Sequence, residues 1–212
     1  MIFSPWTDFL DQVSPSAVGA PVGAQLQAIK AATIRLCQTA RVWSHVSLPA
    51  DLLAGERKYA FRFEDMEAQV VGVNSFRVNG RELRPAGREE WPYGDEQRGQ
   101  PLFWREEEPG FVVLWPIPDR DEPGSIVAHV DLAPALGSGE APRFLLVHYR
   151  EAIKWGALAE LVNTGGQAWG NPNLAIADYE KRFRREIARA RILENIGGAA
   201  GKNLRVDPLP YF

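Results

Sequence analysis

The hydrophobic period of this 212-residue chain changes twice, and that change constrains the fold more than any other feature. Near the amino end, apolar residues recur every three or four positions, which is the spacing of an amphipathic helix. Between about residues 43 and 133 they alternate with polar residues, as in strands with one buried face. After residue 143 the helical spacing returns. The pattern predicts helical segments from both chain ends around an inserted β unit.

The helical segments divide into four expected helices. Ser4 and Pro5 are typical of a helix start, because a serine side chain can cap the first turn and proline fits its first position. Paired glycines at 165–166 and 197–198 are expected to end the last two helices. The four helices are predicted over residues 5–13, 20–41, 143–163 and 172–196.

The β unit shows several strand signals. The dipeptide Asn79-Gly80 follows a long β-rich run and predicts a tight hairpin, since both residues tolerate positive φ. A polar turn, DRDEPG, joins the last two strands. Strands are expected at the alternating residues Tyr59, Phe61 and Phe63, over 68–78, over 111–117 and over 126–132.

These elements predict an α+β fold, in which a helical bundle from both chain ends carries an inserted antiparallel β unit over residues 43–133. Residues 1–198 are expected to form a single domain, and 199–212 an extended C-terminal arm broken by two prolines. A chain of this size buries enough surface to need neither disulfide nor metal. The single Cys37, a start without a leader pattern and the lack of a long apolar run predict a soluble cytoplasmic protein.

Charge is unevenly placed, although the net charge is only −3. Residues 88–122 contain ten acidic and four basic side chains, whereas residues 173–212 contain eight basic and five acidic ones. The small net charge argues against a general nucleic-acid binder. The polarity suits a protein between two different partners, and ordinary solvated charge is the alternative.

No pattern in the sequence prescribes a reaction. His45, His129 and His148 stand singly in different expected elements, without metal-ligand spacing. The run Glu106-Glu107-Glu108 lacks the spaced ligands of a calcium loop. Residues 196–203 miss the first glycine and the hydroxyl of a phosphate loop, and Cys37 falls on the apolar face of a helix. We therefore predict no catalytic residue, no metal and no cofactor.

Three phrases of the sequence together resemble the phage head-to-tail adaptor (connector) family, which includes the tubular adaptors of short-tailed phages. They are the early helix GAPVGAQLQAIKAATIRLCQTARVW, the strand pair FVVLWPIPDRDEPGSIVAHVDLAP and the helical stretch YREAIKWGALAELVNTGGQAWGNPNLAIADYEKRFRREIARAR. The resemblance covers most of the chain and rests on their order and spacing. The family has no invariant functional motif that maps onto single residues.

The resemblance implies a structural virion protein at the neck of the particle, made in the host cytoplasm. It implies a ring, expected as a dodecamer, between the portal protein and a downstream tail protein, with no membrane partner. Genomic DNA would pass through the central channel without sequence-specific binding. The helical part would lie near the portal and the β elements toward the tail. The alternative from another class is a small soluble α+β enzyme or ligand-binding domain of unknown substrate, monomeric and with a deep polar pocket.

Two sets of residues are candidate contact surfaces. The last helix concentrates basic side chains that could meet an acidic protein surface or DNA phosphates, or simply face solvent. An aromatic set in the acidic stretch could anchor a subunit interface or cap the β unit's own core. The charged set is Lys181, Arg184, Arg185 and Arg189, and the aromatic set is Trp91, Tyr93, Phe103 and Trp104.

The C-terminal arm is a third candidate, for docking on the portal or on a neighbouring subunit. Its prolines limit the conformational freedom lost on binding, and its apolar side chains would be wasted in water. The competing reading has the arm folded back on its own helices. The docking residues are expected to be Leu204, Val206, Pro208, Leu209, Pro210, Tyr211 and Phe212.

Overall fold

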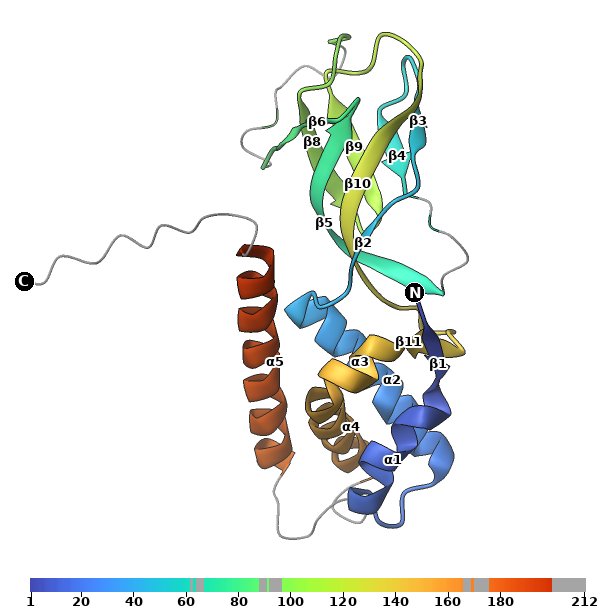
Figure 1. The fold of residues 1–212 in the computed structure, drawn as a ribbon, viewed down its shortest axis with the longest axis vertical. Helices are drawn as coiled ribbons and strands as arrows, with labels where there is room; N and C mark the ends of the chain where they lie inside the picture. The colour runs from blue at the N-terminus through green and yellow to red at the C-terminus, as the bar shows by residue number, and fades with distance from the viewer. Residues whose placement is uncertain are drawn as a thin grey trace, which may run out of the picture.

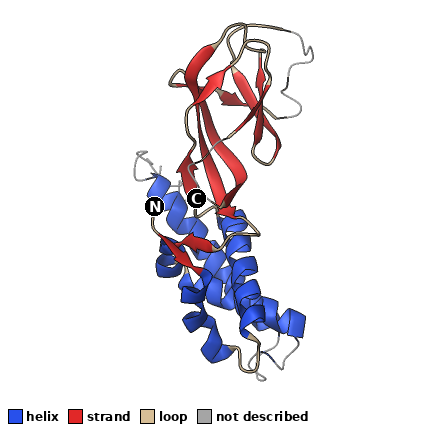
Figure 2. Ribbon diagram, turned by 90° about the vertical axis from the view of Figure 1, so that its right-hand side faces the viewer, coloured by secondary structure: helices blue, strands red, loops and turns tan. Residues whose placement is uncertain are grey.

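A computed structural model describes residues 1–61, 63, 67–87, 91, 97–165, 169 and 176–199. The molecule is elongated, with a helical part at one end of its long axis and a β part at the other (Figure 1). Figure 2 shows the same division from the side, with one small sheet lying against the helices. The helical elements are η1 (Trp6–Phe9), α1 (Leu10–Val13), η2 (Ser14–Ser16), α2 (Val22–Ala40), α3 (Arg143–His148), α4 (Arg150–Gly165) and α5 (Ile176–Ala199).

The β part contains two sheets that face each other. One has the strand order β2-β10-β5-β6, with β3 also paired to β10, and the other has the order β4-β9-β8-β7. The small sheet against the helices pairs β1 (Phe3–Pro5) with β11 (Glu140–Pro142). The other strands are β2 (Ser44–Val46), β3 (Ala50–Leu52), β4 (Lys58–Ala60), β5 (Ala68–Val78), β6 (Arg81–Glu82), β7 (Arg84–Pro85), β8 (Phe103–Glu108), β9 (Phe111–Trp115) and β10 (Glu122–Pro134).

The predicted fold class, a helical bundle from both ends with one inserted antiparallel β unit, is wrong. The strands form three separate sheets, and the sheet of β1 and β11 belongs to the helical end of the molecule. Strands β7 and β8 are parallel. Strands β9 and β10 lie in different sheets, so the polar turn between them crosses from one sheet to the other. Alternation in a sequence reports that a residue lies in a strand, but it does not report which strand becomes its neighbour.

The predicted first helix, residues 5–13, is also corrected. Ser4 and Pro5 lie in β1, where Ser4 pairs with Ala141, and only short 3-10 and α-helical turns follow. Backbone pairing with a strand from far along the chain therefore replaces the expected helix start. The backbone of β1 therefore pairs across a sheet instead of along a helix.

The other expected helices differ in their bounds. Helix α2 lies within two residues of the predicted 20–41. The predicted helix 143–163 is interrupted at Tyr149, whose φ of −120° and ψ of 20° separate α3 from α4. Helix α5 continues through Gly197 and Gly198 to Ala199, because glycine weakens a helix by about 1 kcal/mol without forbidding it.

Both parts share one hydrophobic core. The cluster runs without a break from Phe9 and Leu36 in the helices to Phe76 and Trp104 in the two facing sheets. The hairpin predicted at Asn79-Gly80 is confirmed: both residues have positive φ, and Val78 pairs with Arg81. Figure 1 shows β5 and β10 running from the far tip of the β part down to the helices, so these two strands connect the parts.

Candidate functional site

Helix α5 presents the basic residues predicted as a contact surface. Tyr179, Phe183, Ile187 and Ala190 are buried against the neighbouring helices at helical spacing. The opposite face of the helix is exposed. It carries the basic residues Lys181, Arg184, Arg185 and Arg189.

The exposed charge of this face is positive even though its arginines have acidic neighbours. Arg185 and Arg189 lie 3.5 and 3.9 Å from Glu186, and Arg184 lies 3.8 Å from Glu180. The three arginine side chains are 73–77% exposed, whereas the Glu186 side chain is only 14% exposed. Exposed ion pairs of this kind contribute little stability, and a partner would meet the guanidinium groups first.

A second group of contacts fixes α5 on the rest of the helical part. Arg35 of α2 donates two hydrogen bonds to the Glu180 carboxylate, at 2.8 and 2.7 Å, and its guanidinium lies 4.9 Å from the centre of the Phe183 ring. These hydrogen bonds lower the pKa of Glu180. Near the other end of α5, Tyr149 donates a hydrogen bond of 2.5 Å to Glu194. The basic face is therefore held in a defined position.

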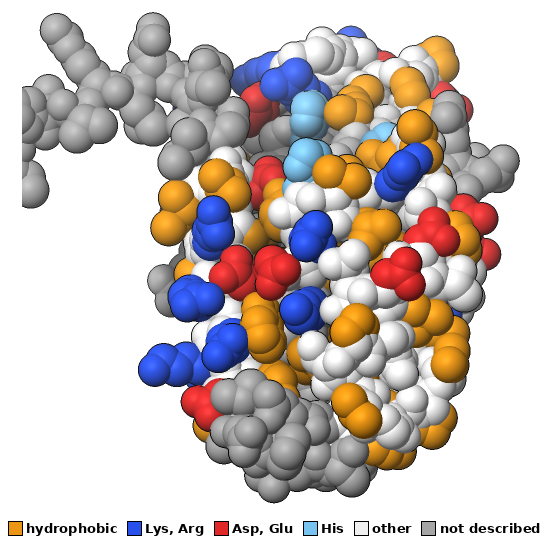
Figure 3. Space-filling model, turned by 60° about the horizontal axis from the view of Figure 1, so that its bottom comes forward, with side chains coloured by type: hydrophobic (Ala, Val, Ile, Leu, Met, Phe, Trp, Pro, Cys, Tyr) orange, Lys and Arg blue, Asp and Glu red, His pale blue; other side chains and the backbone are white. Residues whose placement is uncertain are grey.

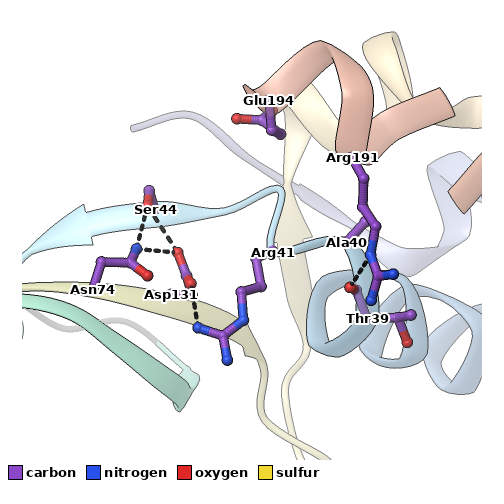
Figure 4. A pocket seen from close by; sticks show the side chains of 8 residues that line it. All are labelled: Thr39, Ala40, Arg41, Ser44, Asn74, Asp131, Arg191 and Glu194. Atoms are coloured by element: carbon purple, nitrogen blue, oxygen red, sulfur yellow. Dashed lines mark hydrogen bonds and ion pairs between the residues drawn. The ribbon is translucent and has the colours of Figure 1, made fainter. Parts of the chain in front are cut away.

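A polar pocket of about 510 Å³ lies where the two parts meet (Figure 4). The Asp131 side chain of β10 is buried at its floor and accepts hydrogen bonds from Ser44 Oγ at 2.8 Å, Asn74 Nδ2 at 2.7 Å and Arg41 Nη1 at 3.2 Å. Arg191 of α5 reaches into the same region and donates to the Thr39 carbonyl at 2.8 Å. The remaining lining residues are Ala40 and Glu194.

Within this pocket, Arg41 connects the end of α2 to the strands of the β part. Arg41 ends α2 in a left-handed conformation, with φ of 55°, and its guanidinium passes over Gly72 of β5. A Cβ at Gly72 would come within 2.6 Å of Arg41 Nη1, so a side chain at this position would require the guanidinium to shift. A buried carboxylate with three donors satisfies most of its lone pairs. The polar groups thus pair with one another across the junction of α2, β2, β5 and β10.

The sequence did not single out Asp131, although it carried a signal. Within the apolar strand stretch AHVDLAP, an aspartate is the only acidic residue. A charged residue in a buried strand is rarely left without partners. Its partners come from residues as much as 90 positions away, at Arg41, and only the folded chain shows them.

The aromatic residues predicted as a subunit interface are divided by the structure. Trp104 lies in the main core, and Trp91 forms a small separate cluster with Ala86 and Val113, against which Phe103 packs. Arg105 lies over the Trp91 ring at 4.6 Å from its centre. Tyr93 lies outside the described residues. Both tryptophans are therefore buried within the chain, and Phe103 is partly exposed.

Of the residues screened for chemistry, His45 and His129 lie on the paired strands β2 and β10, one position apart in register. Burial raises the pKa of the Cys37 thiol to about 12. Lys58 lies 3.9 Å from Glu107 and 3.1 Å from Glu108, so these two carboxylates have a cation beside them. Among the described residues, no group of three His, Cys, Asp or Glu side chains is placed to hold a metal ion.

The phosphate-loop-like stretch and the C-terminal arm lie partly or wholly outside the described residues. Residues 196–199 of the phosphate-loop-like stretch belong to α5, while 200–203 are not described. The docking residues of the arm, 204–212, also lie outside the described residues. None of the helices in the described part of the chain is both long enough and apolar enough to cross a bilayer.

Comparison with known proteins identifies the family. The model of the SU10 adaptor protein family matches residues 5–205. The chain therefore belongs to this family of phage head-to-tail adaptors, and the family predicted from the sequence is confirmed. No curated protein matches the chain.

Proposed function

We propose that this chain is a structural adaptor that assembles as a ring, a dodecamer, between the portal and the tail and lines a channel for the genomic DNA. The family match over residues 5–205 is the observation that carries this proposal. The exposed basic face of α5 supports it, because a positively charged surface on a rigid helix suits contact with an acidic protein surface. The ring would be located at the neck of the virion, and the chain would be made in the host cytoplasm.

Within the ring, the helical part would lie toward the portal and the β part toward the downstream tail protein. Residues 1–198 would act as one adaptor domain, and residues 199–212 as the segment that docks. The elongated shape with different elements at its two ends suits a subunit with different partners above and below (Figure 1). DNA would pass without sequence-specific contacts, and no membrane takes part. The charged contact would use Lys181, Arg184, Arg185 and Arg189, the arm would use Leu204 through Phe212, and Phe103 and Tyr93 would remain as interface aromatics.

The alternative function, a ligand-binding domain or enzyme, has less support. Ligand pockets are mostly apolar, with a few polar groups left to bind the ligand. In the junction pocket, Asp131, Arg41, Ser44 and Asn74 already bond to one another. We therefore assign this pocket a structural role.

The test is assembly with the cognate portal ring. Full-length chain and purified portal should form a complex of several hundred kilodaltons in size-exclusion chromatography with light scattering, and a chain lacking residues 203–212 should fail to join it. The truncated chain should keep the melting temperature of the full chain. A full chain that stays monomeric with portal present would refute ring assembly. A truncated chain that still binds but melts well below the full chain would show that the arm belongs to the core.

A further inference from the structure

The helical part carries opposite charge on its two outer flanks. Helix α5 forms one flank, while β1, β11, η1 and α1 lie on the other side of α2 and α4 (Figure 1). Seen from the helical end, Lys and Arg side chains gather along the α5 side, and Asp and Glu side chains gather at the opposite edge (Figure 3). We call Lys181, Arg184, Arg185 and Arg189 the basic flank, and the exposed acids Asp8, Asp11, Glu67 and Glu140 the acidic flank.

The acidic flank is built by the same contacts that bury the start of the chain. Trp6 and Phe9 turn into the core, so Asp8 and Asp11 between and beyond them point to solvent. Glu67 accepts a hydrogen bond from the Gly139 backbone, which places it beside Glu140 and β1. Lys30 and Arg143 border this flank, but Lys30 is half-buried and donates to the Ser138 carbonyl at 2.7 Å. The acidic flank therefore carries four carboxylates and is bordered by two cations, Lys30 and Arg143.

Each flank also exposes large apolar side chains. Ile192 and Leu193, toward the end of α5, are 58% and 55% exposed, and Ile2, just before β1, is 70% exposed. The end of α5 and the start of β1 both lie near the junction with the β part, while the start of α5 and the turns of η1 and α1 lie farther from it (Figure 1). On the basic flank the charged residues therefore lie farther from the junction than Ile192 and Leu193, and on the acidic flank Asp8 and Asp11 lie farther from it than Ile2.

We propose that the basic flank of one copy of this chain docks on the acidic flank of a second copy. This inference rests on the proposed ring and names the surfaces that form it. Such a contact is head to tail, and repeated head-to-tail contacts close into a ring when each step turns by a fixed angle. A ring of about twelve subunits turns by only about 30° per subunit, so its two contact surfaces must lie on nearly opposite sides of each chain. The two flanks meet this requirement.

Two charge-reversed variants test the proposal. In the first, Arg185→Glu and Arg189→Glu reverse the charge at two of the four positions of the basic flank, and in the second, Asp8→Arg and Asp11→Arg reverse it at two of the four positions of the acidic flank. Each variant alone should need about tenfold or more of the wild-type concentration for half-maximal assembly at low salt, because like charges then face each other. An equimolar mixture should assemble again, because alternating copies restore opposite charges at every contact.

The readout is light scattering of the free chains and, where the wild type assembles only on portal, of chains with portal rings. The control pair Arg81→Glu and Arg84→Glu reverses exposed charge in the β part, and mixing it with the second variant should restore nothing. Wild-type chain that fails to assemble even on portal refutes the ring itself. Wild-type chain that assembles, beside folded variants that assemble equally well alone or whose mixture shows no recovery, refutes the flank contact and leaves the ring standing.

Discussion

The helical part and the β part share one core, but they fill it in opposite ways. In the helical part, small residues let the helices approach: a Cβ on Gly156 of α4 would lie 2.8 Å from Ala32 Cβ and 3.0 Å from the Phe183 ring. In the β part, large rings span the gap between the two sheets, and the Phe76 and Trp104 ring centres are 6.3 Å apart. Added volume should therefore harm the first part, and removed volume the second.

The largest effect is expected in the β part. Trp104→Ala should lower the free energy of unfolding by about 3–5 kcal/mol, because it leaves a cavity between the two sheets. Phe103→Ala, at the partly exposed neighbour, should cost clearly less. Urea unfolding followed by fluorescence and circular dichroism measures both variants. Equal losses of unfolding free energy for the two variants would show that Trp104 contributes no more to the packing of the two sheets than its partly exposed neighbour Phe103.

A smaller effect is expected from added volume in the helical part. Gly156→Ala should destabilise by about 1–3 kcal/mol, since Ala32 and Phe183 must move apart. The matched control is Gly23→Ala, in the first turn of α2. A Cβ at Gly23 would have no atom within 4 Å, so this substitution should be neutral or slightly stabilising. Thermal melts of the two variants give the comparison.

The continuous core also predicts that the helical part and the β part unfold together. Trp104→Ala and Gly156→Ala should therefore each shift one common unfolding transition, and two separate transitions would show that the two parts unfold independently.

The smallest effect concerns pH and the fixing of α5. Arg35 lowers the pKa of Glu180 below its unfolded value, so this pair contributes stability above the unfolded pKa and loses it as pH falls through the folded pKa. The pair is partly exposed, and the loss should be about 0.3–1 kcal/mol. Glu180→Gln should flatten the fall in melting temperature below about pH 4.3, the usual glutamate pKa. Glu151→Gln, at an exposed position of α4, serves as control and should melt like the wild type across this range.

Some local features were readable because they depend on neighbouring residues alone. Asn79-Gly80 makes a hairpin because both residues accept positive φ, and the α2 stripe repeats for five turns. The cations of α5 lie on its exposed face because the apolar residues at helical spacing take the other face. The family was also readable, from the order of three phrases spread over the chain.

Other features depended on partners that are distant in sequence. Ser4 and Pro5 are a good helix start by local chemistry, but pairing of β1 with β11 across more than 130 residues decides their conformation. Trp91 and Trp104 read as a possible interface, yet both are buried within the chain by contacts from other strands. The partners of Asp131 come from three separate elements.

The sequence by itself determined the long helix α2, the exposed and buried faces of α5 and the hairpin at Asn79-Gly80, because period and turn chemistry act over a few residues. Only the tertiary structure decided which strands share a sheet, that three sheets form instead of one unit, and that the charged flanks lie on opposite sides. Strand pairing gains its free energy from contacts between residues far apart in the chain, and many pairings satisfy the same alternation. Packing of the whole core selects among them.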